Sequence, residues 1–250
     1  MGSVLLITGA GGGLGSAVAM DRKGHFDEII LLGRTAGPLE VLRKKLELPP
    51  SCVHVAVADV SYPSEVESAL APFTKINGLV NAAGVLGPVK KFGDESWEDW
   101  SRAISVNLIG NAAVCHHALP KLLAGRRGKI VNFAGGGAAW PRVFHSAYAS
   151  SKAAIVRFTE ILAAEHPGLD ANAIAPGAHN TGIWKGETHD KPPEKWADKE
   201  RFCALVSFLL SEKSDGISGK FIHIYDKWEN FKQETLNSEI YTLRRIEPKR

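Results

Sequence analysis

Short apolar runs alternate with helical patterns along almost the whole chain. Runs that are apolar throughout are typical of strands covered on both faces. Strands that alternate with helices predict a parallel sheet with right-handed crossovers and helices on both faces, a doubly wound α/β fold. We expect seven strands, at Val4–Thr8, Glu28–Leu32, Val53–Val57, Gly78–Asn81, Lys129–Phe133, Leu169–Ile174 and Lys220–Tyr225. The helical patterns begin at about Leu14 and then cover Pro38–Leu46, Glu65–Ala71, Trp97–Leu123 (interrupted near Pro120), Ser146–Glu165 and Arg201–Leu210.

The turn between the first strand and the first helix is rich in glycine and reads TGAGGGLG over residues 8–15. Glycines at this place allow a tight turn and let the backbone approach a phosphate closely. The helix that follows presents free N–H groups and the positive end of its dipole to an anion. We therefore interpret this turn as the pyrophosphate site of a dinucleotide; the alternative is a turn that is merely flexible.

The end of the second expected strand predicts which dinucleotide is preferred. An acidic residue there would accept hydrogen bonds from the ribose 2′-hydroxyl and favour NAD(H). This chain instead has Leu32-Gly33-Arg34-Thr35, in which Arg34 can pair with a 2′-phosphate. NADP(H) is therefore expected in preference to NAD(H), the alternative being that Arg34 is a solvated surface side chain.

Charge and cysteine content argue against several classes of protein. A formal net charge of +3 in 250 residues is too small to indicate nucleic-acid binding. The apolar runs are all shorter than the roughly 18 residues that a membrane span needs. The cysteines Cys52, Cys115 and Cys203 have neither zinc nor disulfide spacing, and His179 and His189 have no ligand partners at metal-binding spacing. We expect a cytoplasmic protein with no metal, nucleic-acid or membrane partner.

The pattern contains no linker that would divide the chain, so residues 1–250 are expected to form a single domain. Residues 182–200 are a mixed, proline-containing insertion that we interpret as a lid over the substrate, with Trp184 as a candidate substrate contact. Residues 226–250 follow the last strand as a C-terminal tail.

Tyr148 and Lys152 are four residues apart in the expected helix Ser146–Glu165 and therefore share one helix face. A tyrosine with an ordinary pKa of about 10 needs a neighbouring cation to exchange protons at neutral pH. On its own such a pair is usually a plain surface feature. Downstream of a dinucleotide-binding turn, it indicates acid–base chemistry.

Several motifs, taken in order, resemble those of the short-chain dehydrogenase/reductase family in its single-domain branch, which has a Rossmann-like fold. The resemblance covers about residues 3–225. It consists of Thr8-Gly9-x-x-x-Gly13-x-Gly15, Asp59-Val60, Asn81-Ala82-Ala83-Gly84, Asn107, Tyr148-x-x-x-Lys152 and Pro176-Gly177 with Thr181. The segment at residues 81–84 has alanine for the second asparagine of the family's NNAG motif. Each motif alone is weak, but their order makes the set highly specific.

The resemblance implies a role for each matching residue. Tyr148 would be the general acid in reduction or the base in oxidation, and Lys152 would lower the pKa of Tyr148 and bind the nicotinamide ribose. Asn107 would hold a water that connects Lys152 to solvent. The family also implies a homodimer or homotetramer built on Trp97–Leu123 and Ser146–Glu165. The cofactor contacts implied are Thr8, Gly9, Gly13, Leu14, Gly15, Arg34, Asp59, Val60, Asn81, Ala82, Gly84, Tyr148, Lys152, Pro176, Gly177 and Thr181.

The chain departs from the family at the serine that normally hydrogen-bonds the substrate oxygen. Counting back from Tyr148 places that position at Gly135, or at Ala134 one residue earlier, and neither residue carries a hydroxyl. One alternative is that another side chain replaces the donor, the candidates being His145, Asn132 and Ser146. A second is that the backbone N–H groups of residues 135–137 donate to the substrate oxygen. Otherwise the substrate supplies a polar group, or the reaction proceeds without this donor. Gly135 and His145 therefore join Trp184 as candidate substrate contacts.

The sequence thus predicts an NADP(H)-dependent oxidoreductase that interconverts a secondary alcohol and a ketone by hydride transfer, with Tyr148 as acid–base. The expected partner is a small carbonyl or alcohol compound. Two alternatives stay open at this point. One is a related epimerase or sugar-modifying enzyme with a transient redox step, and the other is a protein that binds NADP(H) without turnover.

Overall fold

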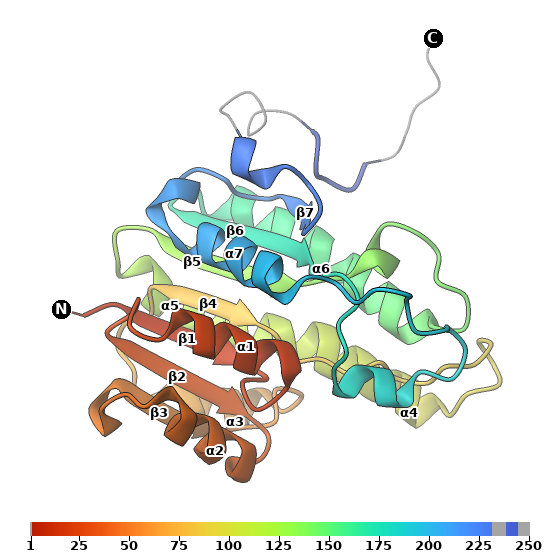
Figure 1. The fold of residues 1–250 in the computed structure, drawn as a ribbon, viewed down its shortest axis with the longest axis horizontal. Helices are drawn as coiled ribbons and strands as arrows, with labels where there is room; N and C mark the ends of the chain where they lie inside the picture. Colours follow the sequence, from red (N-terminus) through yellow and green to blue (C-terminus); the bar gives the residue numbers. More distant parts are fainter. Residues whose placement is uncertain (1, 232–238, 245–250) are drawn as a thin grey trace.

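A parallel sheet forms the centre of the molecule (Figure 1). The computed structural model describes residues 2–231 and 239–244. Across these residues the strand order is β3-β2-β1-β4-β5-β6-β7 and every neighbouring pair is parallel. The predicted doubly wound, seven-stranded sheet is therefore confirmed. Its strands are β1 (Val4–Thr8), β2 (Glu28–Gly33), β3 (Val53–Val57), β4 (Gly78–Asn81), β5 (Gly128–Phe133), β6 (Leu169–Ala175) and β7 (Phe221–His223).

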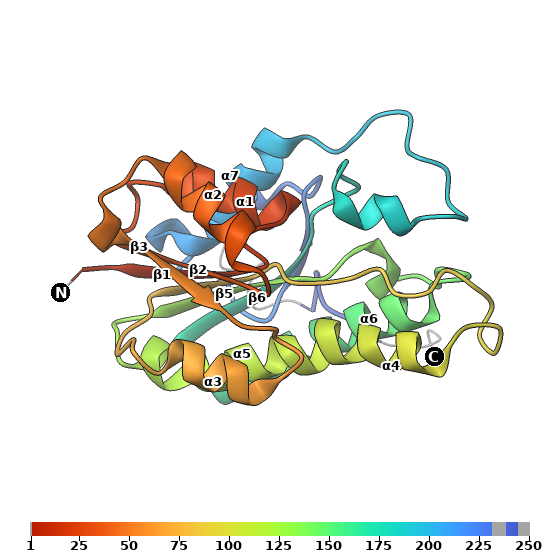
Figure 2. The ribbon, with the colours of Figure 1, turned by 90° about the horizontal axis from the view of Figure 1, so that it is seen from below.

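Helices cover both faces of this sheet (Figure 2). Successive residues of a strand point to opposite faces, so Leu5 and Ile7 of β1 lie in one apolar core and Leu6 in the other. All five residues of β1 are buried, which explains why the strand is apolar throughout. One face is covered by α1 (Gly13–Arg22), α2 (Ala36–Leu46) and α7 (Lys199–Leu210), and the other by α3 (Pro63–Leu70), α4 (Trp97–Ile104), α5 (Gly110–Leu123) and α6 (Ser146–Glu165).

The expected helix Trp97–Leu123 is interrupted at a different place from the one predicted. A π-helical turn, Ser105–Ile109, joins α4 to α5, whereas Pro120 stays inside α5. The missing N–H of Pro120 removes one helical bond, but the next turn still closes, because the Ala124 N–H donates to the Pro120 carbonyl oxygen at 3.2 Å. A π-turn widens a helix locally and is frequent at functional sites. This one contains Asn107.

The described part of the C-terminal tail packs on its own chain. The N–H of Phe221 in β7 donates to the Tyr241 carbonyl oxygen at 2.6 Å, and the Leu243 N–H donates to Glu160 Oε1 of α6 at 2.9 Å. β7 is an edge strand and is shorter than the expected run over residues 220–225. Residues 232–238 and 245–250 of the expected tail lie outside the described residues.

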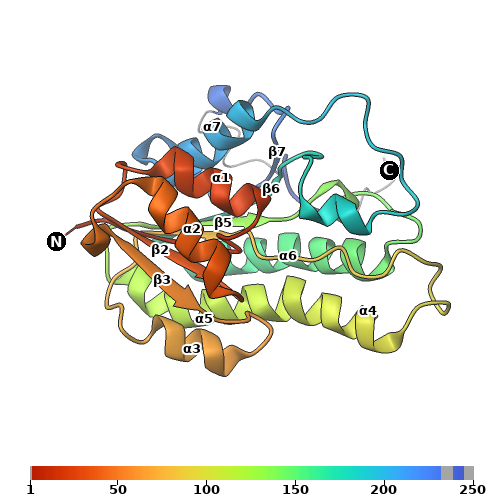
Figure 3. The same cartoon turned by 60° about the horizontal axis from the view of Figure 1, so that its bottom comes forward.

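The carboxyl ends of the parallel strands all face one end of the molecule. Residues 182–200 lie beyond these ends (Figure 3). They begin with a 3-10 turn, Gly182–Gly186, and contain no further helix or strand before α7 begins at Lys199. Ligands of doubly wound folds bind at this edge of the sheet. Within residues 2–231 and 239–244, no helix combines the length and apolarity that crossing a membrane requires.

Candidate active site

The turn after β1 is tightly packed, and several of its glycines have no room for a side chain. A Cβ on Gly15 would lie 2.4 Å from the carbonyl oxygen of Gly9, and one on Gly9 would lie 2.8 Å from the backbone of Ala83. A Cβ on Gly13 would lie 2.5 Å from Thr181, and Gly9 has a positive φ of 62°. Because backbone meets backbone here, the turn is a fixed cradle and not a flexible link.

This turn lines a cavity of about 310 Å³ at the carboxyl ends of the strands, which we call the β1–α1 cavity. The first turn of α1, which begins at Gly13, contains no acidic residue, so its free N–H groups attract an anion without opposition. Predicted cofactor contacts that line this cavity are Gly9, Gly13, Leu14, Gly15, Arg34, Ala82, Gly84, Tyr148, Lys152, Pro176 and Thr181.

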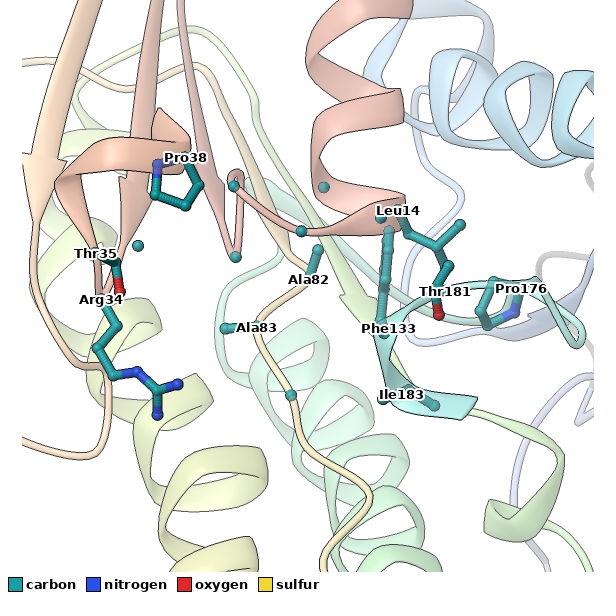
Figure 4. Close-up of a pocket in the computed structure, with 18 of the residues that line it drawn as sticks. Leu14, Arg34, Thr35, Pro38, Ala82, Ala83, Phe133, Pro176, Thr181 and Ile183 are labelled. Atoms are coloured by element: carbon teal, nitrogen blue, oxygen red, sulfur yellow. The ribbon is translucent and has the colours of Figure 1, made fainter. Parts of the chain in front are cut away.

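The β1–α1 cavity is elongated, as Figure 4 shows. Arg34 lies at one end and Leu14 and Thr181 lie at the other, with Ala83 between them. The glycine turn thus stands between a cation and a mostly apolar end. A helix N-terminus behind a glycine turn fits the pyrophosphate of a dinucleotide.

Asp59 and Val60 follow β3 and are not among the residues that line the cavity. Asp59 Oδ1 accepts hydrogen bonds from the backbone N–H and the hydroxyl of Ser61, at 3.0 and 2.7 Å. Burial acts to raise the pKa of Asp59, but these bonds and the charges of Arg34 and Arg102 lower it overall. Asp59 is therefore ionised and lies within electrostatic reach of Arg34.

Thr8 and Asn81 lie beneath the cavity and not in its wall. Asn81 Nδ2 donates to Asn132 Oδ1 at 3.0 Å and to Asn111 Oδ1 at 3.2 Å, and its side chain is buried. Thr8 Oγ1 accepts from the Ala83 N–H at 3.1 Å. This network joins the ends of β1, β4 and β5, so it holds in place the strand ends from which the cavity is built.

Asn107 is fully buried in the π-turn, and both ends of its amide are hydrogen-bonded. Oδ1 accepts from the Val85 N–H at 2.8 Å, while Nδ2 donates to the Val85 carbonyl oxygen at 2.9 Å and to Ser151 Oγ at 3.1 Å. A Cβ on Gly84 would lie 3.2 Å from Asn107 Oδ1 and 3.6 Å from Lys152 Nζ. The structure therefore brings Asn107 and Lys152 together beside Gly84.

Tyr148 lies at the boundary between the β1–α1 cavity and a second cavity. Lys152 Nζ lies 5.6 Å from the centroid of the Tyr148 ring and donates to the Phe133 carbonyl oxygen at 2.7 Å. Burial lowers the pKa of Lys152 to about 8. Burial also raises the pKa of Tyr148, in contrast to the expected lowering, and the charge of Arg142 acts in the opposite direction.

The second cavity, which we call the β5–α6 cavity, has a volume of about 680 Å³ and lies between the β5–α6 loop and residues 182–200. Trp184 and Gly177 line it, as does Gly135. The backbone of Gly135 is extended, with φ 160° and ψ 167°, and a Cβ there would lie 3.4 Å from Tyr148 Oη. A side chain at Gly135 would therefore face the phenol directly.

The structure contradicts the prediction that His145 contacts a substrate. Its side chain is 0% exposed, with Nδ1 2.7 Å from the Val143 carbonyl oxygen and Nε2 2.8 Å from Glu187 Oε2. Each ring nitrogen is thus already within hydrogen-bond distance of an oxygen atom of the protein. His145 therefore binds residues 182–200 and has no N–H left for a substrate.

Glu187 is the centre of an ionic cluster that joins residues 182–200 to the β5–α6 loop. Its carboxylate accepts from His145, from Arg142 Nη2 at 2.8 Å, and from the N–H groups of His189 and Asp190, both at 2.9 Å. Burial acts to raise the pKa of Glu187, but the bonds from Asp190, His189 and His145 hold it at about 2. Arg142 also donates to Asp190 Oδ2 at 2.7 Å. We call Arg142, His145, Glu187 and Asp190 the clasp.

The sequence prediction did not find the clasp. Arg142 and Glu187 are 45 residues apart, and the balanced charges of residues 182–200 gave no sign of where their partners lie. Ligand atoms of His145, Glu187 and Asp190 fall within 4.8 Å of one another, a spacing that a metal ion could use. Here Arg142 bridges the two carboxylates and supplies the positive charge itself.

Known proteins share this architecture. A family model described as short chain dehydrogenase matches residues 3–192. The chain belongs to this family. As a short chain dehydrogenase it is an oxidoreductase, and it is similar to D-threitol dehydrogenase of Mycolicibacterium smegmatis, with 30% identity over 235 residues that cover 87% of this chain and 89% of the relative.

Two solved structures illustrate the shared fold. Levodione reductase is 27% identical, with a TM-score of 0.81 over 89% of this chain and 95% of the other. A short chain dehydrogenase of Escherichia coli CFT073, solved in complex with NADPH, is 23% identical, with a TM-score of 0.82 over 90% of this chain and 97% of the other. The second likeness concerns the fold alone.

Proposed function

We propose that this short chain dehydrogenase interconverts a secondary alcohol and a ketone with NADP(H) as its cofactor. The observation that carries the proposal is the position of Tyr148, which borders both cavities and has Lys152 beside its ring. A proton donor between the β1–α1 cavity, with its glycine turn, and a second cavity suits a reaction in which hydride and proton reach the same carbonyl group.

Arg34 supports the choice of NADP(H). Its guanidinium is exposed at one end of the β1–α1 cavity. A 2′-phosphate would gain a charge-assisted hydrogen bond from Arg34, and the segment after β2 offers no carboxylate to repel it. The NADPH complex of the structurally similar dehydrogenase from Escherichia coli CFT073 is consistent with this choice.

When bound, the nicotinamide supplies a hydride to the ketone or accepts one from the alcohol. Tyr148 donates its phenolic proton to the oxygen of the ketone, and takes that proton back in the reverse direction. Lys152, with a pKa of about 8, keeps a positive charge beside the phenol at neutral pH. Asn107 positions this turn of α6, because it donates to Ser151 Oγ, which in turn donates to the Tyr148 carbonyl oxygen at 2.7 Å.

We further propose that the reaction proceeds without a side-chain hydroxyl at position 135. The bare backbone of Gly135, Gly136 and Gly137 leaves the β5–α6 cavity wide beside Tyr148, and Trp140 and Trp184 add aromatic surface to its wall. These features favour a bulky carbonyl compound that is held by apolar contacts over one that depends on a hydroxyl for its orientation.

A homodimer or homotetramer that packs through α4, α5 and α6 is part of the proposal. Ile109, Leu123 and Ile161 are large apolar side chains in this region, and each is 45–48% exposed in the single chain. Their burial between subunits would remove apolar surface from water.

Oxidation of NADPH, and separately of NADH, with a panel of ketones tests the proposed function. We expect turnover with NADPH, a loss of about 10²–10⁴-fold in turnover for Tyr148→Phe, and retained NADPH binding in that variant. Arg34→Glu is expected to weaken NADPH binding about tenfold or more and to leave NADH binding nearly unchanged.

Two other outcomes would contradict the proposal. Tightly held cofactor with no net consumption of NADPH would indicate the epimerase alternative. NADPH binding with no turnover of any ketone would indicate a protein that senses the nucleotide.

A further inference from the structure

We propose that Arg142 is a positioning residue for Tyr148: two carboxylates from residues 182–200 fix its guanidinium beside the phenol ring, where it stabilises negative charge on the phenol oxygen. This inference rests on the proposed function, in which Tyr148 exchanges a proton with the substrate. It gives the clasp a role in the chemistry in addition to its role in closing the β5–α6 cavity.

Two cations lie at nearly equal distances from the Tyr148 ring. Arg142 Cζ lies 5.8 Å from the ring centroid, compared with 5.6 Å for Lys152 Nζ. Lys152 lines the β1–α1 cavity, whereas Arg142 lines the β5–α6 cavity. Tyr148 therefore has one cation from each cavity within cation–π range.

Arg142 is held by a set of bonds that fixes its direction. Nε and Nη2 both donate to Asp190 Oδ2, at 2.9 and 2.7 Å, and Nη2 also donates to Glu187 Oε2 at 2.8 Å. The side chain of Glu187 is 2% exposed, so water screens its bond to Arg142 weakly, whereas Asp190 is 37% exposed and its bonds to Arg142 are screened more strongly. Nη1 has no hydrogen bond to any described residue, which leaves one side of the guanidinium free to interact with the ring or with a ligand.

The β5–α6 loop folds back over the start of α6. A Cβ on Gly137 would lie 3.6 Å from Arg142 Cβ and 3.4 Å from Ala149 Cβ of α6. The chain after β5 therefore turns closely over the start of α6, and this turn brings Arg142 back to the ring of Tyr148.

The titratable and charged groups around Tyr148 come from five parts of the chain. α6 contributes Lys152, and the β5–α6 loop contributes Arg142. Residues 182–200 contribute Glu187, Asp190 and Lys191. His179, which follows β6, and His223, which ends β7, also line the β5–α6 cavity. Burial raises the pKa of Tyr148, and the charge of Arg142 lowers it. Loss of Arg142 would therefore move the ionisation of Tyr148 to higher pH, and a guanidinium keeps its charge throughout this range.

A spectrophotometric titration of Tyr148 tests this coupling without any need for turnover. Near-ultraviolet absorbance of tyrosinate is recorded against pH for the wild type and for Arg142→Gln, Arg142→Lys and Arg126→Gln. Each protein is measured against the same protein carrying Tyr148→Phe, so that the signals of Tyr62, Tyr225 and Tyr241 cancel. Arg126 is the matched control because it is an exposed arginine outside both cavities.

We expect Arg142→Gln to move the midpoint of Tyr148 to higher pH, Arg142→Lys to restore most of that change, and Arg126→Gln to have no effect. In the reduction assay, kcat/KM of Arg142→Gln should fall roughly tenfold at neutral pH, and its pH profile should move in the same direction as the titration. An unchanged midpoint in Arg142→Gln, or equal midpoints in the Gln and Lys variants, would overturn the inference. If the midpoint depends on Arg142 but the protein turns over no ketone, the inference stands and the proposed function fails.

Discussion

The two cavities that meet at Tyr148 are built in different ways. The β1–α1 cavity is formed mainly by backbone, because the glycines of one short turn pack against β4 and against the start of α1. Two walls of the β5–α6 cavity are held together by charged side chains, because the clasp joins two segments that are 45 residues apart. The shape of the β1–α1 cavity therefore depends on the small size of neighbouring residues in one turn. The shape of the β5–α6 cavity depends on ion pairs between residues that are far apart in the sequence.

This difference determines which changes each half of the site tolerates. A backbone cradle has no spare room, so one added methyl group forces the turn to move. An ionic clasp has a different weakness: a change in charge or protonation leaves buried partners uncompensated. Substitutions that alter size without charge should act on the cofactor half, and substitutions that alter charge without size should act on the substrate half.

Among the substitutions that compare the two cavities, the largest effect is expected from Gly15→Ala. The added Cβ would lie 2.4 Å from the carbonyl oxygen of Gly9, and both groups belong to the backbone, so the cradle must open. Overpacking of this kind costs about 1–3 kcal/mol, which corresponds to a loss of roughly 10–100-fold in NADPH affinity. Isothermal titration measures this loss. Gly37→Ala is the control, because a Cβ at Gly37 in α2 meets nothing within 4 Å; equal affinities in the two variants would contradict the fixed cradle.

A smaller effect is expected from Glu187→Gln, which keeps the size of the side chain and removes its charge. His145 and Arg142 lose their shared anion, so residues 182–200 should close less firmly. A hydrogen bond to a charged group contributes about 1.5–3 kcal/mol, and we expect KM for the ketone to rise roughly tenfold while NADPH affinity stays unchanged. A loss of NADPH affinity in this variant would remove the distinction between the two halves.

The same substitution makes a prediction about pH. The pKa of Glu187 in the folded protein is about 2, below its ordinary value of 4.5. A lowered pKa stabilises the folded state fully above the ordinary pKa, and this contribution is lost as pH falls through the folded value. The free energy of unfolding of the wild type should therefore exceed that of Glu187→Gln near neutral pH, and the two should converge between about pH 4.5 and pH 2. Urea unfolding at a series of pH values measures the difference, and parallel curves would count against the clasp.

The smallest effect is expected from Gly135→Ser, which adds a hydroxyl where the β5–α6 cavity meets Tyr148. The extended backbone of Gly135 accepts any residue, and a Cβ there would lie in ordinary contact with Tyr148 Oη, at 3.4 Å. A new donor to the substrate oxygen should raise kcat for small ketones by a few-fold, which is about 1 kcal/mol. Gly136→Ser adds the same hydroxyl where a Cβ has no neighbour within 4 Å, and it should bring no gain. Equal changes in the two variants would show that position 135 is not special.

Much of the fold followed from residues that are close together in the sequence. The strands, the glycine turn and the four-residue spacing of Tyr148 and Lys152 depend on periodicity and on backbone sterics over a few positions. Their places in the structure agree with the prediction. The boundary errors, such as the shorter β7 and the π-turn at Ser105–Ile109, arise where packing against other elements overrides the local pattern.

The side chains whose partners are distant could not be placed in this way. His145 resembled a spare hydrogen-bond donor because it lies three positions before Tyr148, yet Glu187, 42 positions away, occupies its second ring nitrogen. The family resemblance implied that Asn81 contacts the cofactor, but its buried amide donates instead to Asn132, 51 positions away, beneath the cavity.

The sequence by itself determined a doubly wound sheet, a phosphate cradle after β1 and a tyrosine–lysine pair, because each depends on neighbours along the chain. Only the tertiary structure decided that Arg142 lies beside the tyrosine ring, that Glu187 holds it there, and that Gly135 faces the phenol. The physical reason is distance along the chain. The ionic and hydrogen-bond partners of these side chains lie in segments that only folding brings together, so no local sequence pattern indicates them.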